Sequence, residues 1–188
     1  MQTLKQHILP VVALLITGAS ALVVAHHRPH SLPMVTYRYP GAVIVIYAFF
    51  RFVALSDKRR TAQLDEMGLF RPLRDGAFLL CTHAQLFELG IVLGWLSPFV
   101  DIHLGALGWA ILLTGFYAHR QPRGLLGRLV NVLPAKTPAQ RARLCNGFVF
   151  SGVLGVIGSF VNIASLAWSL APLALVLLIA WRAARSAQ

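Results

Sequence analysis

Long apolar runs alternate with short polar and basic segments along the whole chain. Several of these runs approach the roughly 20 residues that a helix needs to cross the hydrocarbon core of a bilayer. The pattern predicts an all-α integral membrane protein, a bundle of six transmembrane helices that forms a single membrane domain over residues 1–188. The predicted helices cover residues 8–25, 41–55, 76–97, 102–118, 138–161 and 166–181.

The first apolar run, residues 8–25, could also be a signal peptide. It is longer than the usual signal-peptide core of about 7–15 residues, so we interpret it as the first membrane helix. Small side chains recur along it at four-residue spacing and form a narrow stripe on which another helix could pack closely. These residues are Ala13, Thr17 and Ala21.

The fifth predicted helix has the clearest start. Thr137 suits the N-cap, Pro138 suits the first helical position, and Gln140 can return a hydrogen bond to the cap, as in a capping box. Farther along, small residues again recur at four-residue spacing and predict a ridge for helix packing. The ridge comprises Gly147, Ser151 and Gly155.

Two polar segments, residues 56–75 and 119–136, interleave basic residues with apolar ones. In the first segment Leu64, Met67 and Phe70 are spaced to share one helical face. Such an apolar face beside basic residues is typical of a short helix on the membrane surface. Each segment therefore predicts a short interfacial helix in a cytoplasmic loop.

Charge constrains the topology. Only 12% of the residues are charged, against about 25% in a typical soluble domain, and the net charge of +11 is concentrated between the apolar runs. We therefore attribute it to topology and not to nucleic-acid binding. Of the 17 Lys and Arg residues, only Arg28 and Arg38 are outside if both termini are cytoplasmic, and Arg51 lies within a helix. Because cytoplasmic loops are enriched in Lys and Arg, we expect a protein of the bacterial inner membrane with both termini in the cytoplasm. We expect anionic lipid head groups to contact the basic loops.

The third predicted helix carries polar and ionisable residues within an apolar span, and such residues are a functional-site hypothesis by default. Counted from Asp75 at about 1.5 Å per residue, Glu88 lies near the middle of the membrane core. Gln85 precedes Glu88 by three residues and shares its face. Glu88 either handles protons or a polar solute, or it is a neutral packing residue bonded to Gln85 or Thr17.

Two further residues are candidates for ligand or proton handling. His83 lies in the same span as Glu88, and Arg51 lies near the inner end of the second helix. Arg51 is not level with Glu88. We expect it either to extend to the lipid head groups, or to pair with His83 or line an inner cavity.

The sequence contains no GxSxG, HExxH, P-loop or GxGxxG motif and no carboxylate cluster of the kind that holds catalytic magnesium. Cys81 and Cys145 are far apart in the sequence, and we expect the group of His26, His27 and His30 to lie in a solvated loop. We therefore predict no catalytic residue, no cofactor and no metal site.

Six helices in 188 residues, with both ends inside and a small-residue stripe on the first helix, are similar in outline to the substrate-binding subunits of energy-coupling-factor vitamin importers. The likeness is architectural and implies no site residues. We expect a non-catalytic transport or solute-binding subunit, or an accessory subunit that joins another membrane subunit or a second copy. The alternative is a membrane enzyme that acts on an anionic lipid, with His83 or Glu88 as acid or base.

Overall fold

The computed structural model describes residues 2–29, 36–96, 102–133 and 137–160, with positions 171, 173–175 and 178. Within this part of the chain the regular structure is entirely helical, as the predicted fold class requires. The sixth predicted helix, residues 166–181, lies largely outside the described residues. Three described segments are long and apolar enough to cross a membrane, namely His7–His27, Arg38–Ser56 and Pro138–Ser159.

The helices form two compact units. The first unit comprises residues 1–61 and 73–99, and the second comprises residues 62–72 and 100–188. The first unit contains α1 (Gln2–His27), α3 (Arg38–Ser56) and most of α5 (Phe70–Val92). The second unit contains the end of α4 (Lys58–Glu66) and all of α6 (Ile102–Arg120), α7 (Leu125–Asn131) and α8 (Pro138–Ser159).

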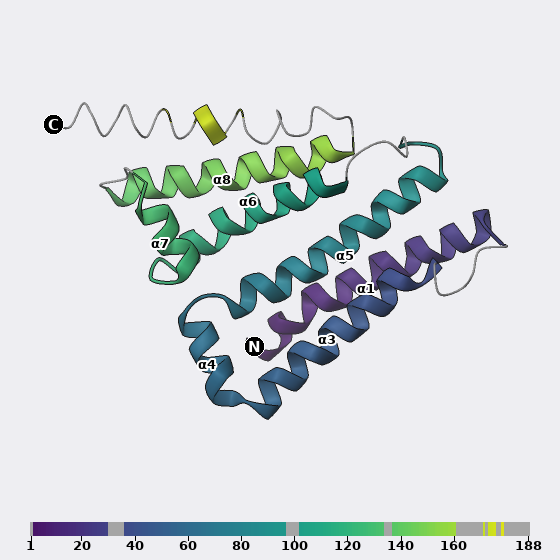
Figure 1. Ribbon diagram of the computed structural model, residues 1–188, viewed down its shortest axis with the longest axis horizontal. Helices are drawn as coiled ribbons and strands as arrows, with labels where there is room; N and C mark the ends of the chain where they lie inside the picture. The colour runs from purple at the N-terminus through teal and green to yellow at the C-terminus, as the bar shows by residue number, and fades with distance from the viewer. Residues whose placement is uncertain are drawn as a thin grey trace. The chain divides into compact units, whose positions relative to one another are not determined.

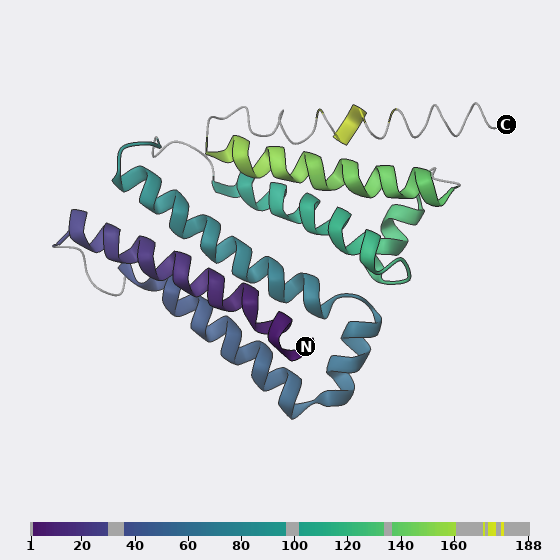
Figure 2. The ribbon, with the colours of Figure 1, turned by 180° about the vertical axis from the view of Figure 1, so that it is seen from behind.

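In the first unit, α1, α3 and α5 run alongside one another in alternating directions (Figures 1 and 2). Phe78 of α5 packs with Ala13 of α1 and Val43 of α3 in a buried apolar cluster. Thr17 and Ala21 are fully buried with Ala13 on the same face of α1. The small residues of α1 therefore line the interior of the first unit.

The start of α5 differs from its predicted start. The helix begins at Phe70 instead of Gly76, with Pro72 in its first turn. A proline is tolerated there because its missing amide would have no partner within the helix. The helix therefore includes the last residues of the basic segment that precedes the apolar span.

The end of α5 also differs from the prediction. The helix stops at Val92 because Gly94 adopts the left-handed conformation, with φ of 73°. The Trp95 amide then donates to the Gly90 carbonyl at 2.8 Å and the Gly94 amide donates to the Ile91 carbonyl at 3.1 Å, which is a Schellman motif. Because of this early end, Glu88 lies in the last turns of α5 and not near its middle.

In the second unit, α6 and α8 run side by side in opposite directions, and the short α7 lies across one end of the pair (Figures 1 and 2). A Cβ atom placed on Gly108 of α6 would be 2.6 Å from the amide nitrogen of Val156 on α8. One placed on Gly115 would be 2.5 Å from the Cys145 carbonyl oxygen. The two backbones are therefore in direct contact. The ridge residues Gly147, Ser151 and Gly155 are all buried in α8.

The capping box predicted for α8 is confirmed. The Gln140 amide donates to Thr137 Oγ1 at 3.1 Å, and the Thr137 amide donates to Gln140 Oε1 at 3.1 Å. Pro138 takes the first helical position. These bonds satisfy amides that the first turn of a helix otherwise leaves without partners, so they set where α8 begins.

Candidate functional site

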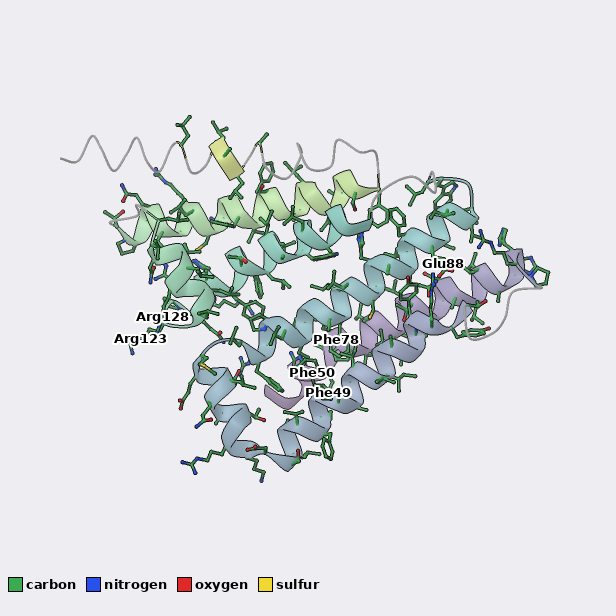
Figure 3. The ribbon with its side chains drawn as sticks, viewed as in Figure 1. Phe49, Phe50, Phe78, Glu88, Arg123 and Arg128 are labelled. Carbon is green, nitrogen blue, oxygen red and sulfur yellow. The ribbon has the colours of Figure 1, made fainter. Side chains whose placement is uncertain are left out.

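One face of α5 points into the interior of the first unit. Phe78, Cys81 and Gln85 are three and four residues apart and therefore share this face. Phe78 is fully buried in the apolar cluster, and Cys81 packs against the same cluster. Glu88 continues the face toward the end of α5, as Figure 3 shows. The apolar interior near Phe78 thus becomes polar near Gln85 and Glu88.

Gln85 is fully buried, and neither its Oε1 nor its Nε2 atom has a hydrogen-bond partner among the described residues. A buried polar group without a partner costs about 1–3 kcal/mol, and native proteins contain few of them. A leucine of similar size would avoid both penalties. Gln85 is therefore expensive for the fold, and its presence calls for a functional explanation.

Glu88 forms an ion pair that the sequence did not predict. Its Oε1 atom lies 3.4 Å from Arg38 Nη2, where α3 begins. The Arg38 guanidinium also lies over the ring of Tyr39, 4.7 Å from the ring centroid. The second carboxylate oxygen of Glu88, Oε2, is buried and has no hydrogen-bond partner among the described residues. We call Gln85, Glu88 and Arg38 the polar centre.

The polar centre differs from the neutral packing cluster that was the alternative expectation for Glu88. In that cluster Glu88 is bonded to Gln85 or Thr17, but the amide atoms of Gln85 have no partner among the described residues. The Thr17 hydroxyl donates to the Ala13 carbonyl at 2.8 Å, within its own helix. The partner of Glu88 is instead Arg38, because Glu88 lies near the end of α5 and Arg38 lies at the start of α3, which runs in the opposite direction.

His83 and Arg51 lie apart from the polar centre. His83 is buried, but it is only two residues from Gln85 and so points to a different side of α5, with its ring 6.3 Å from that of Phe87. Arg51 is exposed and follows Arg38 by thirteen residues along α3. That separation is about 20 Å of helix rise, so Arg51 lies at the opposite end of the first unit from Glu88.

Sequence reasoning missed Arg38 because the second predicted helix, residues 41–55, begins after it. In the structure α3 begins at Arg38, and Pro40 sits in its first turn. Proline is tolerated in the first turn of a helix, so Pro40 is compatible with a helix that begins at Arg38. Arg38 and Glu88 then fall at the same end of two helices that run in opposite directions.

The polar centre has a defined hydrogen-bonding capacity. The atoms Gln85 Oε1 and Glu88 Oε2 can each accept a hydrogen bond, and Gln85 Nε2 can donate. The negative charge of Glu88 is offset by Arg38. Comparisons with protein-family models, with curated proteins and with solved structures gave no match.

Proposed function

We propose that this chain is a small polytopic membrane protein that binds an uncharged polar solute at the polar centre and acts as a transport or solute-binding subunit. The observation that carries the proposal is the fully buried Gln85, whose amide has no partner among the described residues. A solute that bonds to this amide would offset the cost of burying it. Binding and folding would then be coupled at one residue.

The chemistry of the polar centre indicates the class of solute. Two acceptor atoms and one donor are available on Gln85 and Glu88. Because Arg38 compensates the charge of Glu88, a cation gains little electrostatic energy from the centre. The best match is a neutral molecule with at least two O–H or N–H donors and one acceptor, such as a polyol or a primary amide.

Three helices able to cross a membrane support insertion of the chain in a bilayer. We extend this to six spans in a bacterial inner membrane, with both termini cytoplasmic, because that arrangement leaves only Arg28 and Arg38 in outer segments. In this topology α3 begins at the outer face, so the polar centre is reached from outside. Reporter fusions after Arg60 and Lys136 should be cytoplasmic and one at Ser31 external, and the reverse result at any of them contradicts this topology.

Solute binding is tested by native mass spectrometry from gentle detergent and by thermal unfolding with a panel of polyols and primary amides. At least one solute should raise the unfolding midpoint of the wild-type protein, and Gln85→Leu should abolish that rise. Thr82→Val is the matched control on α5, because the Thr82 hydroxyl already donates to the Phe78 carbonyl at 2.9 Å. This variant should keep the full solute response.

Two results would contradict solute binding. One is an equal solute response in wild type and Gln85→Leu, which places the site elsewhere. The other is no retained or stabilising solute for the wild-type protein, with a second protein chain retained instead in the mass spectrum. That outcome would favour an accessory subunit of a larger membrane complex.

A further inference from the structure

A second polar site lies entirely within the second unit, between the end of α4 and α7. It is a pocket of about 520 Å³, a volume within the usual range for small-molecule sites. Its polar lining includes Gln63, Glu66, Arg123 and Arg128, and its apolar lining includes Met67 and Leu125. Figure 3 shows the two arginines on the same side of α7. Cationic and apolar groups thus line a single pocket.

The two chain segments that form the pocket are fixed to each other by backbone contacts. The Leu125 amide donates to the Met67 carbonyl at 2.8 Å. Next to this bond, Gly68 has a φ of 68°, and a Cβ atom placed on it would be 3.0 Å from the Cα of Gly124. Only glycine suits this conformation and this close approach, so the two segments meet in one arrangement.

The loop that carries Arg123 is held by side chains that bind its carbonyl groups. Arg128 Nε donates to the Arg123 carbonyl at 3.1 Å. Asn131 Nδ2 and Arg141 Nη2 each donate to the Pro122 carbonyl at 3.4 Å. These bonds hold the backbone at Arg123 beside the pocket.

The pocket has an excess of positive charge. Among residues 62–72, 102–133 and 137–160, neither Arg123 nor Arg128 forms an ion pair. Two guanidinium groups and the Glu66 carboxylate leave one net positive charge at the pocket. Guanidinium groups bind phosphate oxygens through paired N–H donors, and Glu66 and Gln63 can accept hydrogen bonds from hydroxyl groups.

An apolar stripe continues outward from the pocket along α7. Leu125, Leu129 and Val132 are four and three residues apart, so they share one side of the helix. They are 45%, 55% and 84% exposed. On the opposite side of α7, Val130 is buried in a cluster with Ala118 of α6 and Leu144 of α8. An exposed apolar stripe beside arginines is the pattern of a helix at a lipid surface.

We propose that this pocket binds the head group of an anionic phospholipid. Arg123 and Arg128 hold the phosphate, Glu66 and Gln63 accept hydrogen bonds from head-group hydroxyls, and Leu125, Leu129 and Val132 lie along the acyl chains. The phosphate charge of −1 neutralises the net charge of +1 at the pocket. The site is independent of the polar centre, because all of its residues belong to the second unit.

The test measures lipid binding to the full chain in detergent by native mass spectrometry, with added phosphatidylglycerol or phosphatidylcholine. Phosphatidylglycerol should bind more tightly. Arg123→Gln should weaken its binding about tenfold, the effect of losing one charge-assisted contact to phosphate.

Arg143→Gln is the matched control, because Arg143 is exposed on α8 and does not line the pocket. It removes the same charge and should change the affinity less than about twofold, because solvent and salt screen an exposed charge outside the pocket.

Equal weakening by Arg123→Gln and Arg143→Gln would overturn the proposal, since it would reveal diffuse attraction to the basic surface. Equal binding of the two lipids would overturn it as well. Displacement of the lipid by millimolar inorganic phosphate would show that the pocket takes free phosphate instead. Unfolding midpoints of both variants, measured without lipid, check that a loss of binding is not a loss of fold.

Discussion

The two units bring their helices together in different ways. In the second unit the backbones of α6 and α8 touch, because a Cβ atom placed on Gly108 would be 2.6 Å from the Val156 amide nitrogen. In the first unit α5 meets α1 and α3 through side chains, with Phe78 in the apolar cluster and Gln85 fully buried. The interface of α6 with α8 depends on glycines, which have no side chain. The interface of α5 contains Gln85, whose side-chain amide has no hydrogen-bond partner among the described residues.

This difference distinguishes an interface that holds two helices together from one that we propose binds a solute. Helices in a membrane gain little from the hydrophobic effect, so close packing of small residues is a main source of their association. Glycines bring α6 and α8 into close backbone contact, which leaves no space for a ligand at Gly108 and Gly115. The Gln85 amide does the opposite, since it adds a desolvation cost to the first unit without a protein partner among the described residues. Changes in the two interfaces should therefore affect stability with opposite signs.

The largest effect is expected for Gly152→Ala in the second unit. The added methyl group would lie 2.6 Å from the backbone Cα of Leu112 on α6, which cannot move without separating the helices. We expect a loss of about 1–3 kcal/mol in the free energy of unfolding, as for other overpacked interiors, measured by thermal unfolding in detergent. Gly18→Ala on α1 is the matched control, because a Cβ atom there has nothing within 4 Å.

The control should be neutral or slightly stabilising, since alanine favours a helix over glycine by up to about 1 kcal/mol. Equal losses in the two variants would mean that the effect of Gly152→Ala is not one of close packing. Full stability of Gly152→Ala would show that α6 and α8 are farther apart than described.

The next effect has the opposite sign. Without solute, Gln85→Leu should raise the free energy of unfolding by about 1–2 kcal/mol, because it removes two buried groups that have no partners. The same unfolding measurement checks this, with Thr82→Val as the control on α5. A loss of stability on replacing Gln85 would mean that the amide is already satisfied inside the fold, and the contrast between the two units would disappear.

The sequence predicted the parts of the fold that depend on local chemistry. Thr137 and Gln140 form the expected capping box, because that motif involves only neighbouring residues. The α-helical class and the three segments able to cross a membrane follow from the length of the apolar runs. A short helix was predicted in each basic segment, and the structure has α4 in the first and α7 in the second. The position of these helices at the membrane surface stays a prediction.

The candidate site was less predictable, because it depends on where helices end. The left-handed Gly94 ends α5 at Val92, so Glu88 lies near the end of α5 and close to the start of α3 instead of near the middle of the helix. The sequence placed Arg38 in a loop, so the ion pair with Glu88 could not be foreseen. The lack of partners for Gln85 is a property of three packed helices, and no local pattern reveals it.

The smallest effect concerns the Arg38 and Glu88 pair. Arg38 is half exposed, with 49% of its side chain accessible, so the pair itself should contribute no more than about 1 kcal/mol. Glu88 is only 13% exposed, and removing its partner leaves a carboxylate with little solvation. Arg38→Gln should therefore cost more than Glu88→Gln, and Glu88→Gln should recover stability when added to Arg38→Gln.

A double-mutant cycle by thermal unfolding at low and high salt measures this coupling, which salt should weaken. If the cycle shows no coupling and Arg38→Gln is as stable as Glu88→Gln, then Arg38 does not compensate the Glu88 charge. The polar centre would then carry a net negative charge. In that case a cationic solute, and not a neutral polyol or amide, would be the better match to Gln85 and Glu88.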